Sequence, residues 1–402
     1  MDKNVIKNGK TLTAEIRDIL TYKEEEITDE EVLKLIEEHV LRDDQLAMYS
    51  YKENAQLIGR VFNAIRRDLD ILQPFVEDIQ VSEIMVNGKD HIFVEKMGTL
   101  QKVDITFDST EDLEELIRRI ASKVHREINE MNPIVDARLE DGSRVNAVYK
   151  NIALGGPILT IRKFPEKAIN MKTLIDNGSI TKEAAEFLRI LVKAGYNCFI
   201  SGGTSSGKTT FLNVLSNYIP SSERVIVIED SAELQIRQIE NLIRMECKNA
   251  NVQGKGQITM EQLIKTSLRM RPDRIIVGEV RGKEVMDMIS AMNTGHDGSL
   301  STGHGNSING MLRRLESMFL QAADFPIDAI RSQIAEGLDL IIHLGRLPDG
   351  SRKVLEIAEI LDLKDGVIQI NSLFKYKAKT GLKMTGNVIV NREKLELKGE
   401  HL

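Results

Sequence analysis

The sequence has few cysteines and no long run of apolar residues. It contains only two cysteines, Cys198 and Cys247, which lie far apart and form no C-x-x-C pair. A disulfide framework and a zinc site are therefore not expected, and both cysteines are interpreted as core residues. No stretch approaches roughly eighteen consecutive apolar residues, and no apolar signal core follows the first residues. These absences favour a soluble, cytoplasmic protein.

An excess of basic residues is also missing. The formal net charge is −7, and the first fifty residues hold thirteen acids against seven bases, so the rest of the chain is close to neutral. No basic stretch interleaved with aromatic residues is present, although such stretches are typical of single-strand nucleic-acid binding. Direct contact with nucleic acid is therefore not expected. The acidic run Glu24-Glu25-Glu26 is interpreted as a solvated face, with a docking tail as the alternative.

The first part of the chain divides into a helical and a mixed segment. With 402 residues, 42% of them apolar, the chain is long enough for two or three domains with separate cores. Residues 1–71 show helical spacing of apolar residues and a capping box of Thr28 and Glu31, which predicts a helical acidic extension. Residues 72–164 alternate β-branched runs with turn signals around one helical stretch, which predicts a small α+β domain.

A change of composition marks the second part of the chain. Asn and Gly residues over 165–180 predict a linker, and a helix from Lys182 to Ala194, stopped at Gly195, opens the next domain. Apolar strands alternate there with helical patterns, which is typical of a mostly parallel sheet with flanking helices. We predict this α/β domain over residues 181–402, including a β-rich C-terminal tail.

The clearest motif is a glycine-rich loop between a strand and a helix. Gly202, Gly207, Lys208 and Thr209 satisfy the pattern G-x-x-x-x-G-K-[ST]. In this order of elements, backbone N–H groups and a helix N-terminus can surround a phosphate chain. Lys208 is expected to reach the β- and γ-phosphates and Thr209 to hold Mg²⁺; an ordinary glycine-rich turn is the alternative. The predicted ATP-binding residues are Gly202, Gly203, Thr204, Ser205, Ser206, Gly207, Lys208, Thr209 and Thr210.

Acidic residues follow two later apolar strands. The run 225–228 ends at Glu229 and Asp230, and a second run ends at Glu279. Ligands of open α/β sheets gather at the carboxyl ends of the strands, so both sites are expected near the phosphates. We expect Glu279 to hold Mg²⁺ and Glu229 to act on water. A turn or cap role is the alternative at the first site, and Asp230 is the residue that could fill it.

Two histidines, His296 and His304, lie close together in the segment 294–304. A metal site is one interpretation, but no Cys or Glu completes a ligand set at zinc spacing. We therefore favour hydrogen bonding to a phosphate or to a catalytic acid.

Three arginines, Arg138, Arg144 and Arg162, interrupt the apolar pattern of the strands in the α+β domain. Each could point to solvent. Beside a nucleotide, however, a guanidinium brought against the γ-phosphate neutralises charge in the transition state. Both interpretations stay open at this point.

The order of these motifs resembles the type II/type IV secretion superfamily of hexameric traffic ATPases, over about residues 75 to 345. The motifs are the glycine loop, Ile228-Glu229-Asp230, Arg271-Pro272-Asp273 with Gly278-Glu279-Val280-Arg281, and Thr294-Gly295-His296 to Thr302-Gly303-His304. Asp136-Ala137-Arg138-Leu139, Asp141-Gly142-Ser143-Arg144-Val145-Asn146 and Thr160-Ile161-Arg162-Lys163-Phe164 are similar to the tight-adherence (CpaF-type) pilus ATPases. The tetracysteine module of the zinc-bearing branch is missing.

The resemblance implies a role for each matching residue. Glu229 corresponds to a catalytic glutamate, Glu279 to an atypical Walker B glutamate, and His304 to a histidine that senses the γ-phosphate. Arg144 and Arg162 correspond to arginines that close on the nucleotide when the N-terminal domain swings over a RecA-like ATPase domain. The implied ligands are ATP and Mg²⁺. The implied partners are further copies in a homo-hexamer and an inner-membrane platform protein, which provides the only membrane contact.

We therefore predict a hexameric ATPase that drives assembly or secretion of a pilus-like fibre or a secreted substrate. A conjugation-type translocation ATPase and a pilus-retraction motor are alternatives within the family. A nucleotide-binding scaffold with little hydrolysis is the alternative from another class, and a RecA-like DNA motor is disfavoured by the acidic balance. The tail Gly381 to Leu402 receives no assignment.

Overall fold

The computed structural model describes residues 3–22, 27–43, 46, 49–124, 126–139, 141–164, 169–248, 250 and 255–402. The acidic run Glu24-Glu25-Glu26 lies outside these residues, as does the start of the expected linker. The chain divides into two compact units, Met1–Lys167 and Ala168–Leu402, which are described separately. Within the described residues, no helix is both long and apolar enough to cross a membrane.

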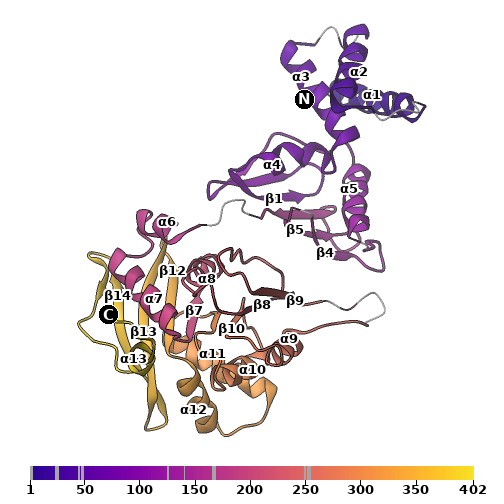
Figure 1. Ribbon diagram of the computed structural model, residues 1–402. Coiled ribbons are helices and arrows are strands. Elements are labelled where there is room, and N and C mark those ends of the chain that lie inside the picture. Colours follow the sequence, from indigo (N-terminus) through magenta and orange to yellow (C-terminus); the bar gives the residue numbers. More distant parts are fainter. Residues whose placement is uncertain are drawn as a thin grey trace. The chain divides into compact units, whose positions relative to one another are not determined.

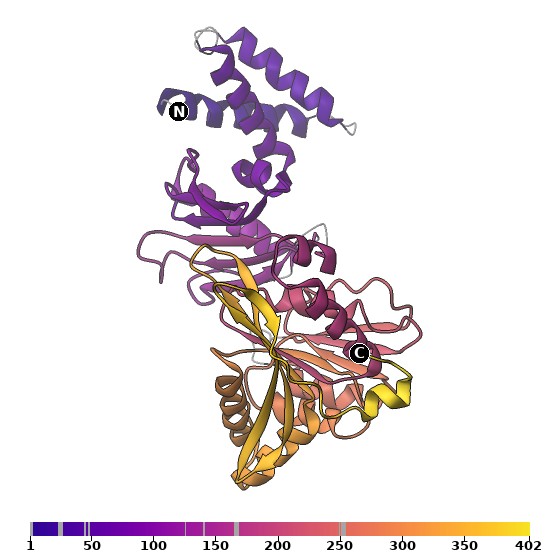
Figure 2. The same cartoon turned by 90° about the vertical axis from the view of Figure 1, so that its left-hand side faces the viewer.

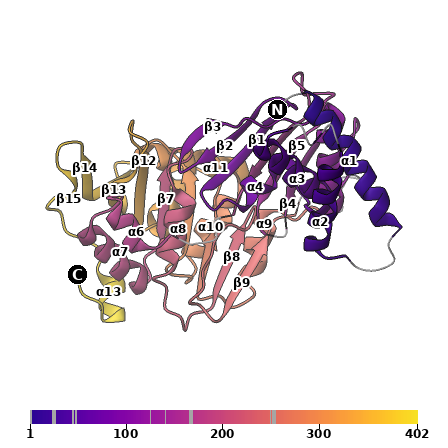
Figure 3. The same ribbon diagram turned by 90° about the horizontal axis from the view of Figure 1, so that it is seen from above.

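Three helices begin the first unit. They are α1 (Lys3–Thr21), α2 (Asp29–Arg42) and α3 (Tyr51–Arg66), and their apolar faces share one core (Figure 3). The expected capping box of Thr28 and Glu31 starts α2, and Ser50 with Glu53 forms a second box at the start of α3. Each box satisfies backbone N–H groups that the first helical turn leaves without a partner. A short 3₁₀ turn, η1 (Asp70–Leu72), and α4 (Gln73–Glu77) follow.

A six-stranded antiparallel sheet forms the rest of this unit, in the order β3-β2-β1-β6-β5-β4. Its apolar side shares a core with α5 (Thr110–Lys123), whose first turn is capped by Ser109 and Asp112. The turn after β1 needs glycine, because a Cβ on Gly88 would lie 2.5 Å from the Gly155 oxygen. The strands are β1 (Val81–Asn87), β2 (Ile92–Lys96), β3 (Thr99–Lys102), β4 (Ile134–Arg138), β5 (Arg144–Val148) and β6 (Ile158–Arg162).

A nine-stranded sheet organises the second unit, in the order β15-β14-β13-β12-β7-β11-β10-β8-β9. The strands from β12 to β9 are parallel, and β13 to β15 extend the sheet in antiparallel fashion. The strands are β7 (Cys198–Gly202), β8 (Val225–Glu229), β9 (Leu242–Glu246), β10 (Arg274–Val277), β11 (Leu300–His304), β12 (Leu340–Arg346), β13 (Arg352–Lys364), β14 (Val367–Lys377) and β15 (Gly381–Met384).

Helices cover both faces of this sheet (Figure 1). On one face α7 (Lys182–Ala194) and α8 (Lys208–Ser216) pack over Cys198 and Ile200. On the other, helices α9 to α12 pack over Phe199, which points the opposite way because side chains alternate along a strand. These helices are α9 (Met260–Ser267), α10 (Glu284–Met292), α11 (Ile308–Ala322) and α12 (Ile327–Gly337). The predicted α/β class with a mostly parallel sheet is confirmed.

Two details go beyond the sequence analysis. The segment expected to be a linker contains α6 (Met171–Asp176), whose N-cap is Asn170 and whose Met171 lies in the core. The tail continues past β15 into α13 (Glu393–Lys398), and the yellow ribbon of Figure 2 follows these strands and the helix. Cys198 is buried as expected, whereas Cys247 is only half-buried.

Candidate nucleotide-binding site

The glycine loop joins a fully buried strand to a helix N-terminus. β7 ends at Gly202 and α8 begins at Lys208. A Cβ on Gly202 would lie 2.4 Å from the Ser206 Oγ and 2.7 Å from the Leu344 oxygen, so no other residue fits there. Gly207 and Ser205 both have positive φ, at 91° and 57°. A non-glycine residue held in this region is strained, and such strain is concentrated at ligand-binding sites.

Lys208 is held in place at the end of this loop. Its side chain is buried, with 8% of the residue exposed, and its Nζ donates to the Gly203 oxygen at 3.1 Å. The Nζ also lies 3.2 Å from the Nδ1 of His304. Burial lowers the pKa of Lys208, and Glu279 partly offsets this effect. The residue is therefore a partly desolvated cation beside a loop of backbone N–H groups, which is an arrangement suited to a phosphate.

His304 connects Lys208 to Glu279. It ends β11 directly beside Gly202 of β7, and its Nε2 lies 2.9 Å from the Glu279 Oε1. The pair is close but not aligned as a hydrogen bond, so this buried oxygen has no hydrogen-bond partner. The pKa of His304 is lowered by burial and then by Lys208. A neutral imidazole that accepts from Lys208 at Nδ1 carries its proton on Nε2, facing Glu279.

The second oxygen of Glu279 is bound by Arg281. The Arg281 Nε and Nη2 donate to the Glu279 Oε2 at 2.9 and 2.7 Å. This contact of Arg281 was not predicted from the sequence, although its place two residues after an acid in a turn is compatible with it. The arrangement leaves one oxygen of Glu279 facing His304 and fixes the other.

Glu229 lies on the neighbouring strand. It ends β8 and is 3% exposed, and a Cβ on Gly278 would lie 3.1 Å from its Cγ. Its Oε1 accepts the N–H groups of Glu233 and Leu234 at 2.7 and 3.0 Å. The capping role that the sequence suggested for Asp230 is thus filled by Glu229. Its buried side chain accepts hydrogen bonds from the backbone of the loop that follows β8. Burial raises the pKa of Glu229, and the two N–H groups oppose that shift.

The two histidines of the segment 294–304 lie at opposite ends of β11. His304 is at the carboxyl end, with Lys208 and Glu279. His296 precedes the amino end, and its Nδ1 lies 3.1 Å from the Ala291 oxygen. A shared metal is therefore not formed. Among the described residues, no three His, Cys, Asp or Glu side chains come together as a metal-binding group.

The three arginines of the first unit form one row. Arg138 is directly opposite Arg144, and Arg144 is directly opposite Arg162, across β4, β5 and β6. Residues directly opposite in a sheet lie on the same face, and like charges placed so are destabilising. Glu83 extends the row as the partner of Arg162 in β1.

Comparison with known proteins identifies the class of the chain. Residues 66–384 match the family described as "Type II/IV secretion system protein". The chain is 32% identical over 289 residues to the conjugal transfer protein TrbB of Rhizobium radiobacter, covering 71% of this chain and 85% of that protein. It is 38% identical over 322 residues to an uncharacterized protein of Methanocaldococcus jannaschii, covering 75% of this chain but only 44% of that longer protein.

The fold comparison agrees with the family match. The ATPase DotB of Legionella pneumophila aligns with 72% of this chain and 79% of its own, at 22% identity and a TM-score of 0.52. The chain belongs to the type II/IV secretion system protein family, with the RecA-like fold and preceding domain that the motifs implied. The closer similarity to the tight-adherence branch stays a prediction.

Proposed function

We propose that this chain is an ATP hydrolase that binds Mg-ATP at the glycine loop. The observation that carries the proposal is the connection from Lys208 through His304 to Glu279, directly beside the loop. A cation, a neutral imidazole and a carboxylate are thus lined up where a terminal phosphate would meet the loop. An ordinary turn would have no use for a buried, partly desolvated lysine.

Each residue has a proposed task. Residues 202–210 wrap the phosphates with backbone N–H groups, and Lys208 binds the β- and γ-oxygens. His304 would contact both the γ-phosphate and Glu279. Glu229 would act as the base that takes a proton from water. The Glu279 Oε1, a buried oxygen without a hydrogen bond, suits a cation ligand. Thr209 and Glu279 would hold Mg²⁺ together with phosphate oxygens, and the cation would neutralise charge there.

We further propose that arginines of the first unit supply positive charge that stabilises the transition state of hydrolysis. The row of Arg138, Arg144 and Arg162 places three arginines opposite one another on one face of the sheet, and a guanidinium brought against a γ-phosphate neutralises charge in the transition state. Closure of the first unit on the nucleotide would then couple hydrolysis to motion between the units. In a homo-hexameric ring, this motion would act on an inner-membrane platform protein from the cytoplasmic side.

The work performed is proposed to be assembly or secretion of a pilus-like fibre or a secreted substrate. A translocation ATPase of conjugation type is the second candidate, because the chain is 32% identical to a conjugal transfer protein. A pilus-retraction motor uses the same site and is distinguished by its cargo. Isolation of the native protein from membranes, with identification of the co-purifying components, separates these cases.

The substitution Glu279→Gln tests hydrolysis itself. We expect ATP binding to persist and turnover to fall by about a hundredfold or more, because the carboxylate that faces His304 and the cation loses its charge. The matched control is Glu336→Gln, at an exposed position of α12 in the same unit. Wild-type turnover that is negligible from the start, with tight ATP binding, would favour a nucleotide-binding scaffold instead. Tight single-strand DNA binding at low salt would favour a DNA motor.

A further inference from the structure

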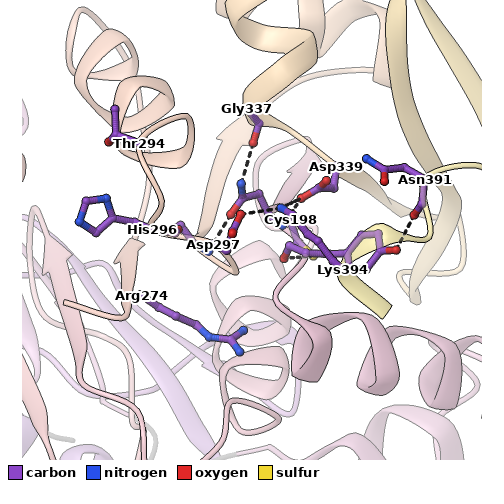
Figure 4. Close-up of polar contacts among 12 residues, drawn as sticks. Cys198, Arg274, Thr294, His296, Asp297, Gly337, Asp339, Asn391 and Lys394 are labelled. Atoms are coloured by element: carbon purple, nitrogen blue, oxygen red, sulfur yellow. Dashed lines mark hydrogen bonds and ion pairs between the residues drawn. The ribbon is translucent and has the colours of Figure 1, made fainter. Parts of the chain in front are cut away.

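The C-terminal tail contacts the amino ends of central strands in the nine-stranded sheet, at the end opposite the glycine loop. The Lys394 Nζ of α13 donates to the Asp339 Oδ2 at 2.7 Å and forms an ion pair with the Asp297 Oδ1 at 2.8 Å (Figure 4). Burial alone would lower the pKa of Lys394, but the two carboxylates outweigh it and raise the pKa. Lys394 is thus a cation that two carboxylates share.

The residues just before α13 are also anchored. Glu359 of β13 is 1% exposed and accepts the N–H groups of Val390 and Asn391, at 2.7 Å for Asn391. The Tyr196 hydroxyl donates to the Asn391 oxygen at 2.5 Å, and Ile389 is buried in the core. A buried carboxylate without these donors would bear a large desolvation cost. The tail is therefore part of the folded unit.

Lys394 joins the amino ends of three adjacent strands. Asp297 precedes β11 and Asp339 precedes β12. Between them, Asn197 precedes β7, and its N–H donates to the same Asp339 Oδ2 at 2.7 Å. Asn197 also accepts from the Ser299 N–H at 3.0 Å and donates to the Gly337 oxygen at 2.9 Å. One network thus links the starts of β12, β7 and β11.

The opposite ends of these strands carry the nucleotide site. Cys198 is in register with Leu300 and Leu340 at the amino end. Four residues later, Gly202 is in register with His304 and Leu344. At roughly 3.3 Å per residue, the network and the glycine loop lie only about 15 Å apart along rigid strands. A shift of one strand at its start would move Gly202 relative to His304.

We propose that Lys394 is a positioning residue for the nucleotide site, and that residues 388–395 form a strap that holds β12, β7 and β11 in register from the far edge. The inference rests on the proposed nucleotide-binding function. It concerns a segment beyond the residues matched to the family, which end at 384.

Lys394→Ala in the full chain tests the proposal, with Lys398→Ala as the control. Lys398 lies on the same helix and is exposed, so its loss changes the charge equally. Hydrogen exchange of the nucleotide-free protein is measured for peptides covering β7 with the glycine loop, and for β8 as an internal reference. Affinity for a labelled ATP analogue is titrated in parallel.

We expect Lys394→Ala to speed exchange in β7 and the loop relative to β8, and to weaken analogue binding, each by about tenfold or more. Lys394→Arg should restore most of both. If Lys394→Ala only lowers the melting temperature, with affinity and relative exchange like those of Lys398→Ala, the residue merely stabilises the fold and the proposal is wrong.

The same measurements also cover two other cases: a Lys394→Ala variant that does not fold, and a wild-type protein that binds no ATP. If Lys394→Ala does not fold, Asp297→Asn removes the more exposed partner, whose side chain is 57% exposed. We expect a smaller effect in the same direction, and no effect on either readout would overturn the proposal. If the wild-type protein binds no ATP, the proposed function fails, but the relative exchange of β7 still decides the role of the strap.

Discussion

Glu229→Gln separates the hydrogen bonds that the structure shows for this buried side chain from its proposed role as the base. Glutamine keeps an oxygen that can accept the N–H groups of Glu233 and Leu234, but it loses the charge and the ability to take a proton. We therefore expect nearly normal ATP binding. Turnover should fall by about two to four orders of magnitude, the usual range for loss of a general base.

The same substitution has a predictable effect on stability. Burial raises the pKa of Glu229 in the folded protein. For a raised pKa, the stabilising contribution is fully present below the unfolded pKa and is lost as pH rises through the folded pKa. At neutral pH the wild type therefore carries the cost of a buried charge. We expect the melting temperature of Glu229→Gln to equal or exceed that of the wild type at neutral pH, with a difference that shrinks on acidification.

Glu229→Ala measures what the hydrogen bonds from Glu229 to the loop after β8 contribute to stability. It leaves the N–H of buried Leu234 without its acceptor, which costs about 1–3 kcal/mol. Thermal unfolding at several pH values, analogue titration and steady-state turnover measure the three effects. If Glu229→Gln loses binding in step with turnover, or is destabilised as much as Glu229→Ala, the carboxylate is structural and its assignment as the base is wrong.

Four other substitutions test the remaining parts of the site. Lys208→Ala should abolish tight ATP binding in an equilibrium titration, and unchanged affinity with normal turnover would refute the loop assignment. His304→Ala should lower turnover more than binding; because the pKa of His304 is lowered, wild-type turnover should not decline through its protonation between pH 8 and about 6.5. Arg144→Ala and Arg162→Ala should each fold and form a ring by light scattering with Mg-ATP, yet lose turnover by about a thousandfold. Turnover within about threefold of wild type would make them surface residues.

Features set by neighbouring residues could be predicted from the sequence. The capping box of Thr28 and Glu31 and the end of a helix at Gly195 are confirmed, because both depend on contacts within one turn. Glu279 and His304 also lie beside Lys208 as the motifs implied, since carboxyl ends of parallel strands share one edge of a sheet.

Features that depend on the exact register of distant strands, or on contacts outside any motif, could not be predicted. The row of Arg138, Arg144 and Arg162 exists only because of the register of β4, β5 and β6, and a slip of one residue would place one arginine on the other face. The partners of Lys394 likewise lie near residues 297 and 339. Nothing within the tail itself indicates them, which explains why it received no assignment.

The order of strands in the second unit also bears on how the protein becomes competent to bind its ligand during synthesis. The hairpin of β13 and β14 pairs residues close in sequence, whereas β7 pairs with β11 and β12, about a hundred or more residues further along the chain. Local pairs form quickly, and distant parallel pairs form late because loop closure opposes them. The glycine loop also precedes its neighbours His304 and Leu344 in the sequence, so it emerges from the ribosome well before them. The proposed nucleotide site would then form only near the end of folding, so that nucleotide binding would show that the second unit has folded completely.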